Sequence, residues 1–198
     1  MKALSTVLCF FLLATGSIAA DTPPKPKLKM ASDGFPSGHE TPEGAACDLA
    51  RAFIRRDGAL FTNACVSAKL YNASDAGKQY AGFLKDKVDS IRSEAAKKEP
   101  SSGGPKSIGK VFAARHLTKN GPASYGYAAF EFRDVMFVDV GVFLQSGKPL
   151  LNRTLVIKDS DGKWYVHPMP SVSPLLSDGL NDEKPSEKDF REVYEIEK

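Results

Sequence analysis

The spacing of apolar residues changes once along the chain, near residue 106. Between residues 41 and 98 apolar side chains recur every three or four positions, which is typical of helices. Beyond residue 106 they recur every second position, which is typical of strands. The pattern therefore predicts an α+β fold, in which helices come first and cover one face of an antiparallel sheet.

Three helices are expected in the first part. The first begins at Thr41, because threonine is a good N-cap and Pro42 suits the first helical position. Gly58 is placed to end this helix. A short helix is expected over 59–65, and a long amphipathic one over 75–98. The apolar stripe of the first helix comprises Ala46, Leu49, Ala50, Phe53 and Ile54.

Five strands are expected in the second part, separated by turns rich in Gly, Asn, Asp and Pro. Connections this short force antiparallel neighbours, so the strands should form a meander. The expected strands are residues 108–117, 124–133, 135–145, 150–158 and 163–167.

Residues 1–19 have the layout of a secretory signal peptide. Lys2 precedes an apolar run, and small residues lead to a cleavage site after Ala19. The run is shorter than the roughly 18–20 residues of a membrane span. We therefore expect a secreted or periplasmic protein whose mature form has no membrane anchor.

The folded domain is expected over 41–170, with polar segments on both sides. Residues 20–40 are rich in Pro and Lys and predict a disordered leader, either solvated or touching an acidic surface. Residues 171–198 form a polar acidic tail, with eight acidic and four basic residues from Asp178 onward. Within that tail, 186–197 is either a docked helix or disordered.

Charge and cysteine content narrow the class of protein. The net charge of +3 is too small to indicate nucleic acid as the main partner. Cys9 would leave with the signal peptide, so Cys47 and Cys65 remain. An oxidising compartment favours a disulfide between them, and two buried free thiols are the alternative.

The layout resembles the NTF2-like (SnoaL-like) superfamily, a cone-shaped α+β fold with three N-terminal helices packed on a curved antiparallel sheet. Three features over about residues 41–170 support the resemblance: the segment AxxFIRRDGALFTNAC, the long amphipathic third helix, and the closing hairpin LLNRTLVIKDSDGKWYVH. With the export signal, a secreted bacterial member of this superfamily is the expected class. The resemblance implies a cavity between sheet and helices.

Asp139 and Arg153 are charged residues in otherwise apolar rows of two expected strands. A buried charge needs a partner. If both rows face the cone, the two residues pair with each other or bind a ligand, and Tyr125, Tyr127 and His167 could join them. Alternatively the pair closes the cavity or lies on the outer face. Metal-ligand spacings and cofactor-binding motifs are absent from the sequence, so no cofactor is expected.

These features favour a non-catalytic domain that binds a small apolar molecule or a partner protein. One alternative is an isomerase or dehydratase with Asp139 or His167 as the base, since NTF2-like enzymes place an acid or His beside a Tyr in the cavity. The other is an assembly protein that forms a homodimer through the sheet.

Overall fold

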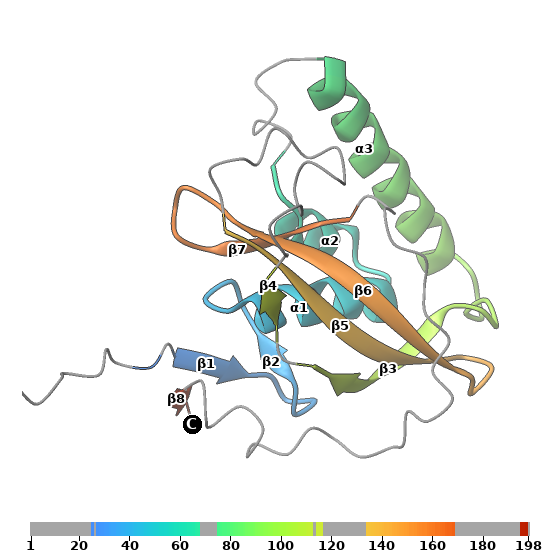
Figure 1. The fold of residues 1–198 in the computed structure, drawn as a ribbon. Coiled ribbons are helices and arrows are strands. Elements are labelled where there is room, and N and C mark those ends of the chain that lie inside the picture. The colour runs from blue at the N-terminus through green and yellow to red at the C-terminus, as the bar shows by residue number, and fades with distance from the viewer. Residues whose placement is uncertain are drawn as a thin grey trace, which may run out of the picture.

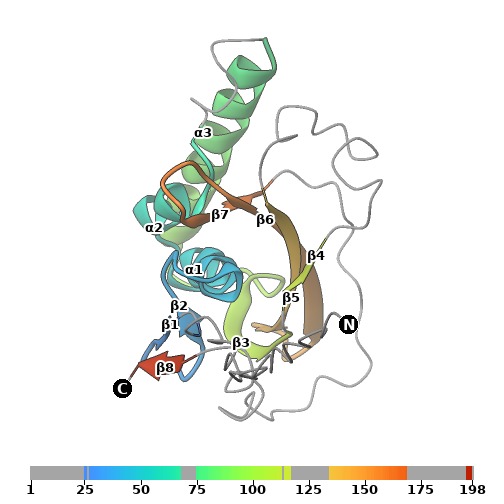
Figure 2. The same ribbon diagram turned by 60° about the vertical axis from the view of Figure 1, so that its left-hand side comes forward.

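A curved antiparallel sheet wraps around one helix in the computed structural model, which describes residues 25, 27–67, 75–112, 114–116, 134–168 and 195–197. Figure 2 shows α1 on the concave side of this sheet, with α2 and α3 beyond its β7 edge. The helices are α1 (Pro42–Arg55), α2 (Gly58–Ala64) and α3 (Asp75–Ala95). The strands are β1 (Lys27–Met30), β2 (Pro36–Ser37), β3 (Pro105–Val111), β4 (Arg115–His116), β5 (Val135–Leu144), β6 (Pro149–Lys158), β7 (Trp164–His167) and β8 (Glu195–Glu197). The expected α+β class, with helices before an antiparallel sheet, is confirmed.

Local capping sets the ends of α1. The hydroxyl of Thr41 accepts a hydrogen bond from the Gly44 N–H at 3.2 Å, as the sequence predicted. The other end differs from the prediction, because α1 stops at Arg55 and Arg56 takes the left-handed conformation, with φ 55°. Gly58 instead begins α2, and a Cβ there would lie 3.1 Å from a side-chain carbon of Val88 on α3. Glycine at this position therefore permits the close approach of the two helices.

The main sheet has the order β3-β5-β6-β7, with β4 also paired to β5 (Figure 1). The hairpins β5–β6 and β6–β7 match the expected antiparallel neighbours. The expected meander is wrong at its start, because β3 and β4 pair directly with β5. The second expected strand, residues 124–133, lies outside the described residues.

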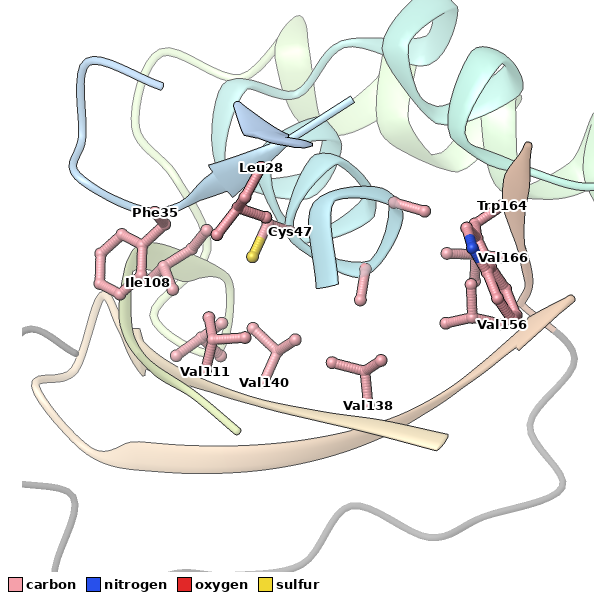
Figure 3. Packing of buried hydrophobic residues seen from close by; sticks show 13 residues of the cluster. Leu28, Phe35, Cys47, Ile108, Val111, Val138, Val140, Val156, Trp164 and Val166 are labelled. Atoms are coloured by element: carbon pink, nitrogen blue, oxygen red, sulfur yellow. The ribbon is translucent and has the colours of Figure 1, made fainter. Parts of the chain in front are cut away.

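The core lies between α1 and the concave face of the sheet. Figure 3 shows Cys47 of α1 and the strand residues Val138, Val140 and Val156 in this layer, closed at one end by Trp164. On β5 the residues at even positions face α1, so those at odd positions lie on the opposite face. This alternation decides which predicted site residues of β5 face α1.

Residues 27–37 are not a disordered leader, which corrects the sequence prediction. Leu28 and Phe35 are 0% and 3% exposed and belong to the core. Arg51 of α1 holds the turn between β1 and β2, with Nε and Nη2 donating to the Asp33 carboxylate at 2.8 and 2.7 Å. The segment is ordered because a buried cation from α1 binds it, a contact that local composition does not reveal.

The described end of the acidic tail is a strand, β8, and residues 195–197 are therefore not helical.

Candidate ligand-binding cavity

A cavity of about 360 Å³ lies between α1 and the sheet. Its α1 wall combines the small residues Ala46 and Ala50 with Leu49 and Phe53. The remaining lining residues are Gly103, Pro105, Val140, Val142, Leu144, Leu150, Asn152, Arg153, Thr154, Leu155, Val166, His167 and Pro168. A mostly apolar lining with a few polar groups is typical of sites for small molecules.

The different lengths of two neighbouring strands help to form the cavity. β7 pairs only with residues 155–158 of β6, since its last residue, His167, lies opposite Leu155. Residues 150–154 of β6 therefore extend past the end of β7, and all of them except Leu151 line the cavity. Alanine at positions 46 and 50 of α1 leaves this space unfilled from the helix side.

Asn152 and Thr154 are the polar groups of the α1-facing row of β6. They lie in the same row of β6 as Leu150 and Val156, which pack on the α1 side, so strand geometry directs them to the cavity side. Thr154 is buried and Asn152 half-buried. An amide and a hydroxyl can each donate and accept hydrogen bonds without carrying charge. The sequence signal for these residues was two polar positions in one row of an expected strand, but the sequence analysis singled out the opposite row, which contains Arg153.

Asp139 and Arg153 pair with each other across β5 and β6. Arg153 Nε and Nη2 donate to the two carboxylate oxygens of Asp139 at 2.8 and 3.0 Å, and the guanidinium lies over the ring of Phe137. Asp139 belongs to the odd row of β5, which faces away from α1. The structure thus brings the two predicted residues together as an ion pair, in which Asp139 is buried. Arg153 contributes to the cavity lining, but its charged head is held by Asp139.

His167 is buried at the end of β7, with 3% of its surface exposed. Its ring stacks on that of Tyr80 from α3, with centroids 4.9 Å apart and planes inclined by 15°. The Tyr80 hydroxyl donates to the carbonyl of Val66 at 3.0 Å, which holds the tyrosine in place. Burial lowers the pKa of His167 from 6.5 to about 4, so the imidazole is neutral at physiological pH.

Of the five residues that the sequence put together, Asp139, Arg153 and His167 can be placed. The first two form one ion pair, and His167 stacks on a tyrosine that the sequence analysis did not single out. Tyr125 and Tyr127 lie outside the described residues. The α1 residues of the cavity were also missed as site residues, because their spacing is that of any helix packed on a core.

Cys47 and Cys65 are both buried free thiols, so the predicted disulfide is wrong. Cys47 packs between α1 and the sheet, while Cys65 belongs to a separate cluster with Ala52, Phe61 and Ile91. The two thiols therefore lie in different layers of the molecule. Burial raises the pKa of both.

We expect neither thiol to react with iodoacetamide in the folded protein, because the thiolate is the reactive form and burial disfavours it. In urea without reductant, the chain from residue 20 onward should gain two carbamidomethyl groups, as measured by intact mass. A chain that gains none in urea until a reductant is added would contain the disulfide instead.

Within the part of the chain that the structure describes, no three His, Cys, Asp or Glu side chains cluster in a way that could hold a metal ion. None of the described helices is both long and apolar enough to cross a bilayer. Comparison with known proteins found no matching family model, no similar curated protein and no similar solved structure.

Proposed function

We propose that this chain is an exported, NTF2-like binding protein whose cavity takes a small apolar molecule with a neutral polar group. The observation that carries the proposal is the cavity between α1 and the sheet, with apolar walls and the Asn152–Thr154 pair on one side. The order of helices and antiparallel strands, and the position of the cavity, support the NTF2-like assignment. The signal-peptide layout of residues 1–19 supports export.

The lining favours an uncharged ligand. Burial of apolar surface contributes about 25 cal/mol per Å² to binding, whereas a buried charge needs an opposite charge as partner. The guanidinium of Arg153 is already bound to Asp139. Asn152 and Thr154 can instead hydrogen-bond a ketone, alcohol or amide without an ion pair.

The chemistry of His167 favours binding over proton transfer. A general base works best when its pKa lies near the operating pH. With a pKa of about 4, His167 is a weak base at neutral pH. Asp139, the other base considered from the sequence, belongs to the row of β5 that faces away from α1.

A neutral fluorescent probe, N-phenyl-1-naphthylamine, tests the cavity directly. We expect saturable binding with increased fluorescence, and at least a tenfold loss of affinity in Ala50→Phe, because the new ring fills the cavity. Ala81→Phe is the matched control, since Ala81 is exposed on α3 and does not line the cavity. Thermal melts of both variants establish that they fold. Equal binding by wild type and Ala50→Phe would contradict the proposal.

The polar pair is tested in the same assay with two competitors, 2-acetylnaphthalene and 2-ethylnaphthalene. Thr154→Val keeps the shape of the side chain and removes one hydrogen-bonding group. We expect about fivefold weaker displacement by the ketone, equivalent to ~1 kcal/mol for one hydrogen bond, and no change for the hydrocarbon. An equal effect on both competitors would assign Thr154 a packing role only.

A further inference from the structure

The smaller sheet joins segments near the two ends of the chain. Its order is β2-β1-β8, with β8 parallel to β1. Figure 1 shows β8 directly beside β1, on the side of the molecule away from α3. The register pairs Lys27 with Glu195, Leu28 with Ile196, and Lys29 with Glu197.

The two strands are complementary in charge and polarity. β1 reads basic–aliphatic–basic over 27–29, and β8 reads acidic–aliphatic–acidic over 195–197. Opposite charges at paired positions stabilise neighbouring strands, and like charges destabilise them. β1 is therefore suited to a strand with the pattern of β8, and unsuited to a basic one.

β1 is held firmly on the domain. Leu28 is fully buried in the main core, and the turn after β1 is bound by Arg51 through Asp33. Met30 also packs against the core. A strand that joins β1 must be ordered itself, but β1 is already in place, which lowers the entropic cost of association.

We propose that β1 is a docking strand for extended segments with the pattern acidic–aliphatic–acidic, and that the chain's own residues 195–197 occupy it. A partner protein with such a segment would bind by adding a strand to β1. It must first displace β8, because both use the same positions of β1. Residues 169–194 tether β8 to the domain, so β8 competes at a high effective concentration. The surface is distinct from the cavity, because none of the described lining residues belongs to β1.

A labelled peptide with the sequence of residues 192–198 (EVYEIEK) is the probe, with fluorescence anisotropy as the readout. The double variant Glu195→Lys/Glu197→Lys places like charges opposite β1 and should release β8 from it. We expect this variant to bind the peptide at least tenfold more tightly than the wild-type chain does. Binding should also weaken in 0.5 M NaCl, because exposed charge pairs are screened.

Charge reversal on β1 provides the specificity test. Adding Lys27→Glu/Lys29→Glu to the double variant should abolish peptide binding, because the acidic peptide then meets an acidic strand. Lys85→Glu/Lys87→Glu, made in the same background on the exposed face of α3, is the control and should bind as before. Equal peptide binding by wild type and the double variant, or equal loss in the control, would overturn the proposal.

Amide hydrogen exchange provides a second test that needs no peptide. Backbone amides in 27–29 should exchange faster in the Glu195→Lys/Glu197→Lys variant than in wild type. The fourfold variant, with reversed charges on both strands, should regain slow exchange. Identical exchange in all three proteins would show that β8 does not protect β1 and would refute the proposal.

Discussion

Replacing Arg51 by methionine is expected to lower the free energy of unfolding by about 3 kcal/mol, the largest loss expected of any single substitution considered for this protein. The guanidinium is almost fully buried and donates to two carboxylates and two carbonyls. Besides Asp33, Nη1 bonds to Asp48 at 2.7 Å and to the Pro36 carbonyl at 2.8 Å, while Nη2 reaches the Phe35 carbonyl at 3.0 Å. Methionine fills similar space but leaves these acceptors without their donor.

Urea denaturation measures this effect, with the denaturant slope as a check that unfolding stays two-state. Arg92→Met is the matched control, because Arg92 and its partner Asp89 are exposed on α3, and such pairs contribute at most about 1 kcal/mol. Arg51→Lys should give an intermediate loss, since an ammonium group cannot match the planar fork of donors. A loss in Arg51→Met no larger than that in Arg92→Met would contradict the assignment.

Asp33 makes the stabilising effect of the Arg51 hydrogen bonds dependent on pH. Burial alone would raise the pKa of this carboxyl, but hydrogen bonds from Arg51 and the Phe35 N–H, together with the arginine charge, lower it overall. The stabilising contribution is therefore present at neutral pH and is lost as the pH falls through the lowered pKa. In Arg51→Met this part of the acid sensitivity should disappear.

The protein is also expected to lose up to about 3 kcal/mol of stability between pH 6.5 and pH 4 because of His167. The unfolded chain takes up a proton near pH 6.5, whereas burial keeps the folded imidazole neutral until about pH 4. Over that interval the unfolded state binds more protons, so stability falls as the pH falls. Below pH 4 both states carry the proton and this contribution stops changing.

Two measurements check the lowered pKa of His167 and its effect on stability. The ring-proton chemical shift of His167 should titrate with a midpoint near pH 4, and His167→Phe, which keeps a ring against Tyr80, should be less sensitive to this pH range than wild type. His39→Gln is the comparison, because it removes a different histidine, one stacked on Tyr165. A His167 midpoint near 6.5 would mean that the ring is solvated and would remove both the stability effect and its place beside the cavity.

Local sequence determined the elements whose signals lie within a few residues of one another. Thr41 and Pro42 start α1, and the short turns force the β5–β6–β7 hairpins. The apolar stripe after Pro42 indicated the side of α1 that lines the cavity, but not the residues that are most buried, which include Cys47 and Arg51. The pairing of β3 with β5 was not predicted, because a strand's partner depends on competition among all strands. The alternation along β5 revealed two rows, but not which of them α1 covers, so Asp139 could be assigned to either face.

Only the tertiary structure decided which distant groups meet, and therefore where a ligand and a partner strand could bind. Leu28 and Phe35 lie in a Pro- and Lys-rich segment that composition marks as disordered, yet Arg51 and the core hold them in place. Cys47 lies in α1 and Cys65 directly after α2, and they belong to different clusters. Secondary structure follows from short-range backbone preferences, which the sequence records locally. The cavity, the hydrogen bonds from Arg51 to Asp33 and the β1–β8 pairing depend on contacts between residues far apart along the chain, which only the packed fold brings together.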